Sequence, residues 1–215
     1  MRLVILGGSG SGKSTQAQQL CDRFEVPLVS TGDFLRDAVA NNSELGKLAQ
    51  PFIQRGELVP DDLMIEFVRS YFAPPPLGVS SLRKSDYDIQ KTLNSRNLAG
   101  GYILGQDFAD YRGWILEGYP RTAFQAEELD FLLDELGEKL NWAIYLQVPE
   151  AVMVSRTLGR SLPDDQPEIV QRRVELFYDR TIPILEYYDR RRRLLTINGD
   201  QSPDMVIENI ISLVG

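Results

Sequence analysis

Short apolar runs alternate with amphipathic stretches along most of the chain. A short run rich in Val, Ile and Leu is typical of a strand in a parallel sheet, because both faces of such a strand are covered. Five runs fit this description and predict strands: Arg2–Leu6, Pro27–Val29, Trp114–Glu117, Ala143–Gln147 and Leu194–Ile197.

Helical periodicity separates the later strands and follows the last one. The predicted helices are Thr122–Leu136, Glu150–Leu158, one from about Pro167 to Arg192, and a closing helix carrying Ile207, Ile210, Ile211 and Val214 on one face. In the long helix we expect a bend at Pro183 and an apolar stripe of Val170, Val174, Phe177, Thr181 and Leu185. Strands separated by helices predict an α/β fold with a five-stranded parallel sheet between two helical layers, and ligands at the carboxyl ends of the strands.

Two regions interrupt this alternation. From Thr31 to Tyr71 three helical patterns follow one another without a strand, which predicts a small helical subdomain. From Ala73 to Arg112 the pattern dissolves behind three consecutive prolines, and we interpret this part as a long insertion. We therefore expect a single domain over residues 1–215, made of a core (1–29 and 113–215), a helical subdomain (30–72) and the insertion (73–112).

Composition and charge restrict the chemistry. The net charge of −8 argues against a general nucleic-acid or membrane-surface binder, so an anion site must be a local cluster of Arg and Lys. The amino-terminal apolar run is short and no twenty-residue apolar span occurs, which predicts a soluble, cytoplasmic protein. The lone Cys21 and the absence of His exclude a disulfide within one chain, a zinc site and histidine-based catalysis.

A phosphate-binding motif links the first strand to a predicted helix at 14–24. Residues Gly7–Thr15 read G-G-S-G-S-G-K-S-T and fit the pattern G-x-x-x-x-G-K-[ST]. The glycines allow main-chain N–H groups to point inward, Lys13 adds a positive charge and Ser14 is placed to ligate Mg²⁺. The alternative is a simple glycine-rich turn, which has no use for the Lys13–Ser14 pair. We predict a nucleoside triphosphate site.

Residues after the second and third strands predict a second anion site at the same edge of the sheet. Ser30 and Asp33 are spaced to cap a helix, and Arg36 lies one turn into it, where it could hold another phosphate. Glu117 ends a strand where a water-mediated Mg²⁺ ligand is needed, although a solvent-facing carboxylate is the alternative. Arg121 and Gln125 lie one turn apart, so a charge for a phosphate and an amide for a base edge would be neighbours.

Elsewhere Pro60 marks a helix start and holds Val59 extended, which leaves the Val59 carbonyl free for a base. Taken together in order, the motifs resemble those of adenylate kinases. They are Gly7–Gln18, Ser30–Arg36, Gly56–Asp62, Glu117–Gln125, Arg156–Arg160, Asp164–Arg173 and Asn198–Asp200. The resemblance covers nearly all of the chain outside 73–112. It implies an ATP-carrying core, a helical AMP-binding subdomain, a lid, and reversible transfer of the ATP γ-phosphoryl group to AMP with Mg²⁺.

The resemblance also implies roles for individual residues. Contacts to ATP would come from Gly10, Ser11, Gly12, Lys13, Ser14, Thr15, Arg156 and Arg160. Contacts to AMP would come from Thr31, Arg36, Glu57, Leu58, Val59, Gly118, Arg121, Gln125 and Arg173. The catalytic cations would be Lys13, Arg121, Arg160 and Arg173, and the metal ligands Ser14 and Glu117. Arg156 would pack on the ATP adenine, Arg160 would hold the ATP phosphates and Arg173 would bridge to AMP.

The predicted lid (160–167) departs from the family pattern. Only three residues separate Arg160 from the Asp164–Asp165 pair, and the arginine that usually precedes the acidic pair is absent. We therefore expect a lid that closes incompletely over ATP. Taken without the resemblance, the arginines around this region would also fit a solvated basic face. A cation of the insertion could replace the missing arginine; the candidates are Arg83, Lys84, Lys91 and Arg96.

Alternatives remain for the insertion and for the activity. The insertion could instead be a surface excursion or an arm that binds an unknown protein partner, and this interpretation is preferred over the replacement hypothesis. The activity could use another monophosphate (UMP, CMP or dAMP), or the chain could be a weakly catalytic nucleotide-binding regulatory module. The AMP-side residues favour an enzyme. By resemblance a monomer is expected.

Overall fold

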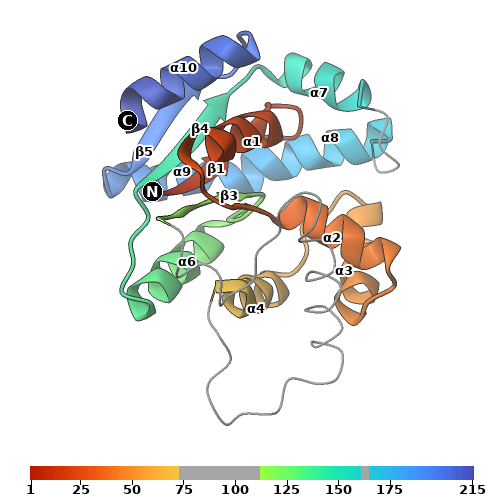
Figure 1. Ribbon diagram of the computed structural model, residues 1–215. Helices are drawn as coiled ribbons and strands as arrows, with labels where there is room; N and C mark the ends of the chain where they lie inside the picture. The colour runs from red at the N-terminus through yellow and green to blue at the C-terminus, as the bar shows by residue number, and fades with distance from the viewer. Residues whose placement is uncertain (73–111, 161–164) are drawn as a thin grey trace.

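The computed structural model describes residues 1–72, 112–160 and 165–215 (Figure 1). Nearly all of the predicted insertion, with Arg83, Lys84, Lys91 and Arg96, lies outside the described residues, as do 161–164 of the predicted lid. The hypothesis that an insertion cation replaces the lid arginine therefore stays a prediction.

Within the described residues, five parallel strands form one sheet in the order β2-β3-β1-β4-β5. The strands are β1 (Arg2–Leu6), β2 (Leu28–Ser30), β3 (Trp114–Glu117), β4 (Trp142–Gln147) and β5 (Leu194–Asn198). This confirms the predicted five-stranded parallel sheet, with boundaries within one residue. The chain leaves β1 toward β2 on one side and later returns to pair β4 on the other side, so the loop after β1 lies where the direction of winding reverses. A sheet of this kind binds ligands at that point.

Helices cover both faces of the sheet, as Figure 1 shows. Helices α1 (Lys13–Phe24) and α10 (Pro203–Val214) bury Leu20 and Ile210 against one face. Helices α6 (Ala123–Glu135) and α9 (Ile182–Arg190) bury Leu129 and Ile184 against the other. Because side chains alternate along a strand, Leu3 and Ile5 of β1 join the first cluster while Val4 and Leu6 join the second. The three-layer architecture is confirmed.

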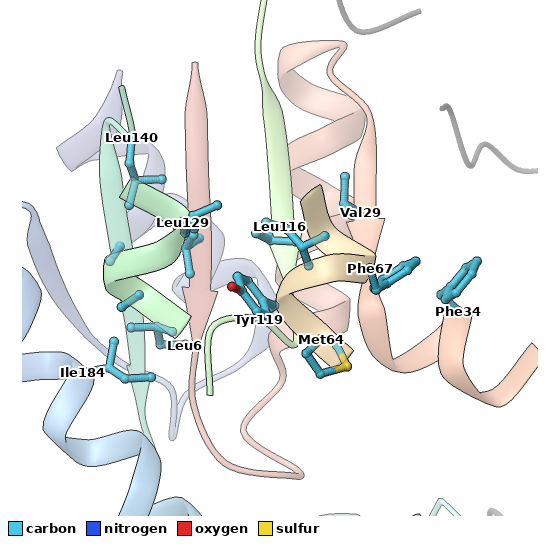
Figure 2. Packing of buried hydrophobic residues seen from close by; sticks show 14 of the residues in the cluster. Leu6, Val29, Phe34, Met64, Phe67, Leu116, Tyr119, Leu129, Leu140 and Ile184 are labelled. Carbon is cyan, nitrogen blue, oxygen red and sulfur yellow. The ribbon is translucent and has the colours of Figure 1, made fainter. Parts of the chain in front are cut away.

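The helical subdomain shares the core of the second face. It consists of α2 (Thr31–Ala40), α3 (Glu44–Gln54) and α4 (Asp61–Phe72), which confirms the three predicted helices. The Phe34 and Phe67 rings stack with their centroids 4.2 Å apart, and Figure 2 shows them beside Met64 and Leu116. The subdomain is thus joined to the sheet by apolar packing.

The long predicted helix is divided into three parts. Helix α8 (Pro167–Leu176) is followed by a π-helical turn (Phe177–Thr181) and then by α9, which ends at Arg190 rather than Arg192. The π-turn ends at Thr181, two residues before Pro183. Proline has no main-chain N–H, so Pro183 cannot donate a hydrogen bond to a carbonyl of the preceding turn. The predicted stripe is buried through Thr181 but continues with Ile184, whereas Leu185 is only partly buried. Helix α7 (Glu150–Leu158) has the predicted bounds.

Candidate active site

A cavity of about 380 Å³ lies at the carboxyl ends of β1 and β3. Its walls come from the β1–α1 loop, α2, the α3–α4 connection, the β3–α6 loop, α7 and α8. Among the described residues, two carboxylates and six cations line the cavity; the cations are Lys13, Arg36, Arg121, Arg156, Arg160 and Arg173. This excess of positive charge, in a chain whose net charge is −8, predicts a ligand with several negative charges.

The β1–α1 loop needs glycine at specific positions. Gly10 and Gly12 adopt φ of +81° and +92°, values that other residues rarely adopt. A Cβ on Gly10 would also lie 2.2 Å from the Met153 carbonyl oxygen of α7, so the loop packs directly on that helix. Ser11 donates its main-chain N–H to the Gly8 carbonyl (3.2 Å), and its side chain is buried away from the cavity. The loop therefore faces the cavity with backbone and Lys13.

Lys13 is held in a poorly solvated position. Its Nζ donates to the Gly8 carbonyl at 2.7 Å. Desolvation lowers the pKa of Lys13 to about 8; the Glu117 carboxylate opposes this shift, while Arg121 and Arg160 add to it. A cation that lacks water and faces other cations is stabilised by a bound anion. The electrostatics thus favour a polyphosphate next to Lys13.

Glu117 is placed by sheet register beside the same loop. In the parallel pairing it is opposite Ile5 of β1 and Ser30 of β2. Its carboxylate accepts hydrogen bonds from Ser14 Oγ (3.3 Å) and Ser30 Oγ (2.9 Å), and the residue is 8% exposed. Glu117 therefore does not face bulk solvent, which disfavours that alternative. Hydroxyl and carboxylate oxygens are the donors that Mg²⁺ prefers, so the pair Ser14 and Glu117 fits this metal.

The predicted monophosphate side meets the same cavity. Thr31 Oγ1 donates to the Glu117 carbonyl (3.3 Å), and a Cβ on Gly118, whose φ is +85°, would lie 2.6 Å from that hydroxyl. Arg36 forms an ion pair with Asp33 and donates a hydrogen bond to the Asp33 carboxylate. Arg121 donates from Nε to the Gly118 carbonyl (3.0 Å).

The charge around Arg121 is unbalanced. Desolvation lowers the pKa of Arg121, Glu117 partly offsets the shift, and Arg173 and Arg36 lower the pKa further. Three guanidinium groups thus act on one region of the cavity, where an anion would relieve their repulsion. The contact residues predicted in the α3–α4 connection, Glu57–Val59, line the cavity beside them.

The side-chain amide of Gln125 has fewer hydrogen-bonding groups available to a ligand than the sequence suggested. It lines the cavity but is only 2% exposed. Its Oε1 accepts from the Arg121 main-chain N–H (2.7 Å), and its Nε2 donates to Asp61 Oδ1 (2.8 Å). Half of the hydrogen-bonding capacity of the amide is therefore already used within the protein.

The arginines of α7 and its carboxyl end have separate partners. Arg156 donates to the Gly199 carbonyl (3.2 Å) and to Asp200 (3.3 Å). Arg160 donates to both oxygens of Asp165 (3.2 and 2.9 Å) and to Ser9 Oγ (3.1 Å). Because Arg156 and Arg160 bind different oxygens, the repulsion between their two charges is reduced.

Asp165 connects the two sides of the site. Its carboxylate, with a side chain only 1% exposed, also accepts from Arg173 Nη1 of α8 at 3.3 Å. One buried acid therefore fixes two cations that face the cavity, Arg160 and Arg173. All predicted site residues line the cavity except Ser11.

Comparison with known proteins gives the family. The adenylate kinase family model matches residues 5–76 and 102–193. The chain is 63% identical to adenylate kinase 2 of Nostoc sp. (strain PCC 7120) over 214 residues, which cover 100% of this chain and 98% of that protein. It is 46% identical to adenylate kinase 2 of Synechocystis sp. (strain PCC 6803) over 212 residues, 99% of each chain. The chain belongs to the adenylate kinase family.

The adenylate kinase match extends beyond the motifs. An adenylate kinase of Xanthomonas euvesicatoria pv. vesicatoria (strain 85-10) is 36% identical to this chain over 219 residues. The alignment covers 100% of both chains. The family model leaves 77–101 unmatched, a stretch inside the predicted insertion, but the Nostoc and Synechocystis alignments run through it.

Three residues of this site make contacts that the sequence did not predict. Ser30, predicted as a helix cap, also donates to Glu117; Ser9 reaches Arg160; and Asp61 reaches Gln125 across 64 positions. The cap of Ser30 is confirmed by its bond from the Asp33 N–H (3.4 Å). Asp61 lies in the Gly56–Asp62 motif, but no spacing pointed to its contact with Gln125, because the two residues belong to different helices.

Proposed function

We propose that this chain catalyses reversible, Mg²⁺-dependent transfer of the γ-phosphoryl group of ATP to AMP, which gives two molecules of ADP. One observation carries the proposal: a single cavity brings the phosphate-binding loop together with a second cluster of cations on the helical subdomain side. A protein that only bound ATP would not need the second cluster. Family membership supports the same activity.

The two nucleotides take opposite ends of the cavity. For ATP, the N–H groups of Gly10 and Gly12 and the Lys13 ammonium hold the phosphates, with Thr15 beside them. The Ser11 N–H is hydrogen-bonded to the Gly8 carbonyl, so Ser11 shapes the loop and is left out of this set. Arg156 packs on the adenine, where its bonds to Gly199 and Asp200 hold the guanidinium. For AMP, Arg36 and Arg121 hold the phosphate, Thr31 and Gly118 shape the floor, and the segment Glu57–Val59 and Gln125 contact the base.

Ser14 and Glu117 would hold the metal, Glu117 through a water molecule. Bound there, Mg²⁺ would neutralise charge on the ATP phosphates and fix their orientation. Ser30 holds the Glu117 carboxylate from the other side at 2.9 Å, so this side chain is oriented by the protein itself. No group of three or more acidic, His or Cys side chains that could hold a metal occurs in the described residues, so phosphate and water oxygens would complete the ligand set.

Phosphoryl transfer depends on position and charge. The AMP phosphate is already an anion near neutral pH, so the step needs alignment of this oxygen with the ATP γ-phosphorus and cations around the transferred group. Lys13, Arg121, Arg160 and Arg173 supply that charge. Because Asp165 already orients two of them, part of the ordering cost is met before substrates bind.

The cellular setting is a separate part of the proposal. No helix among the described residues is long and apolar enough to cross a membrane. We propose a cytoplasmic monomer whose partners are ATP and AMP, and assign the segment 73–112 no partner.

The activity is tested by ADP formation from MgATP with AMP, dAMP, UMP, CMP and GMP in turn. We expect turnover with AMP at least about tenfold above the other ribonucleotides, and loss of turnover in Lys13→Ala. An Asp62→Ala variant serves as the control, since Asp62 is exposed and outside the cavity. Higher turnover with UMP or CMP would reassign the substrate, and nucleotide binding without transfer would support a regulatory module.

A further inference from the structure

The amide of Gln125 is held in one orientation from both ends. The Arg121 main-chain N–H, 2.7 Å from one end, can only donate, so that end must be the oxygen. The Asp61 carboxylate, 2.8 Å from the other end, can only accept, so that end must be the nitrogen. The orientation therefore follows from the chemistry of the partners and not from a choice between two similar atoms.

Asp61 is itself held by a second hydrogen bond. Thr122 Oγ1 donates to Asp61 Oδ2 (3.1 Å) and accepts from the Gln125 main-chain N–H (3.1 Å). The three residues thus form a closed ring between the first turn of α4 and the first turn of α6. Tyr119 adds a bond from its hydroxyl to the Gln125 carbonyl (3.1 Å), so the backbone of Gln125 is fixed as well.

The fixed amide has one lone pair and one N–H left over. An amide in this state is complementary to a base edge with an acceptor next to a donor, such as N1 and the 6-amino group of adenine. Hypoxanthine and guanine present a donor at N1 and an acceptor at position 6, and they would need the amide turned by 180°. Turning it would put two donors together at Arg121 and two acceptors together at Asp61.

We propose that Asp61 is a positioning residue that makes the site selective for a 6-aminopurine monophosphate over a 6-oxopurine monophosphate, by fixing the Gln125 amide. The proposal rests on the proposed function, since it concerns the base of the acceptor nucleotide. Asp61 does not line the cavity, so it would not contact a nucleotide bound there. Its effect passes entirely through Gln125, supported by Thr122.

The test compares AMP with IMP, because the two differ only at ring position 6 and in the proton on N1. Initial rates are measured with varied AMP or IMP at saturating MgATP, and with varied MgATP at saturating AMP. The proteins compared are the wild type, Asp61→Ala, Asp61→Asn and the matched control Asp62→Ala. Asp62 is adjacent on the same helix turn and exposed, so its removal reproduces any effect on the charge of the α4 amino end.

We expect Asp61→Ala to raise the KM for AMP about tenfold, leave the KM for ATP unchanged, and reduce the ratio of AMP to IMP kcat/KM about tenfold. Asp61→Asn offers a single oxygen to two donors, Gln125 and Thr122, and should fall between the wild type and Asp61→Ala. Asp62→Ala should keep the wild-type ratio. Circular dichroism checks folding, and if Asp61→Ala does not fold, the ratio measured for Asp61→Asn decides.

A double-mutant cycle separates positioning from general destabilisation. In a Gln125→Leu background, where no amide remains to orient, removing Asp61 should leave the AMP to IMP ratio unchanged. Equal losses of kcat/KM for AMP and IMP in Asp61→Ala, or a change of ratio that persists in the Gln125→Leu background, would overturn the proposal. If the wild type itself does not phosphorylate AMP, the proposed function fails and the inference fails with it; AMP turnover with an unchanged ratio removes the inference alone.

Discussion

At the scale of single residues, desolvation and neighbouring charges act together on Lys13. Its pKa is lowered to about 8, so in the free protein the charged form predominates only below about pH 8. A bound polyphosphate favours the charged form and raises the pKa again. Free protein and complex should therefore respond differently to pH.

This difference is measurable in the pH profiles of the reaction. The kcat/KM for ATP, which reports the free protein, should fall as pH rises through about 8 because Lys13 loses its proton. The kcat at saturating substrates should stay constant to higher pH. The kcat/KM for AMP should not decrease near pH 8, because the AMP site depends on arginines. A kcat/KM for ATP that is flat up to pH 9.5 would contradict this role of Lys13.

The residues whose position follows from local spacing were the predictable ones. Lys13 and Ser14 follow β1 through the glycine loop, and Glu117 is the last residue of β3. Because β1 and β3 pair in parallel, these residues meet at one edge of the sheet. The sequence placed Gln125 beside Arg121, but its contact with Asp61 was not predictable, because this contact depends on how α4 packs against α6 and not on any pattern around position 125.

At the scale of elements, the turn from β1 into α1 is constrained by α7. Gly10→Ala would place a Cβ 2.2 Å from the Met153 carbonyl at φ +81°, whereas Gly12→Ala adds a Cβ with nothing within 4 Å at φ +92°. We expect Gly12→Ala to lower the free energy of unfolding by about 1–2 kcal/mol from backbone strain alone. Gly10→Ala should lower it by about 2–5 kcal/mol, because overlap is added to strain. Urea unfolding measures both, and equal losses would show that the loop does not pack on α7 as described.

The connection from α7 to α8 depends on Asp165. Asp165→Ala removes the carboxylate that Arg160 and Arg173 share, and both arginines are partly exposed and can be rehydrated there, so we expect a loss of about 1–3 kcal/mol in the free energy of unfolding. The misplaced cations should lower kcat up to about 100-fold. Glu175→Ala, which removes an exposed ion pair to Arg172 on the same helix, is the control and should change neither quantity appreciably. A wild-type kcat in Asp165→Ala would contradict the positioning of these arginines.

Periodicity predicted most elements and their order. It could not predict the π-turn at Phe177–Thr181, because the spacing of buried residues stays close to 3.6 through the turn and on to Ile184. The helical subdomain was recognisable because strands were absent from its pattern. The sequence did not predict the stacking of Phe34 on Phe67, which joins α2 to α4, or the core cluster that these residues share with Leu116 of the sheet.

At the scale of the whole molecule, the distribution of charge explains how an acidic protein binds anionic nucleotides. The chain has a net charge of −8, yet six cations and two carboxylates line the cavity among the described residues. Composition excluded general binding of polyanions and required a local cluster; the fold gathers that cluster from segments far apart in the sequence. The positive charge that lines the cavity therefore favours binding of phosphates there.

Ligand binding should stabilise the whole fold for the same reason. With MgATP or AMP at about 100 times its dissociation constant, the free energy of unfolding should rise by about 2.7 kcal/mol, which corresponds to an increase in Tm of about 5–10 °C. Differential scanning fluorimetry measures the shift. Lys13→Ala should reduce the shift with MgATP and keep that with AMP; equal reduction of both shifts would argue against separate nucleotide positions.

Direct transfer between two nucleotides held in one cavity is tested by a single turnover with ATP labelled with ³²P at the γ-position, excess enzyme and AMP, followed by separation of the products. We expect the label to appear in ADP, its appearance to require AMP, and Lys13→Ala to prevent it. Label released as inorganic phosphate at the same rate with and without AMP would contradict direct transfer, because the cavity would then deliver the phosphoryl group to water.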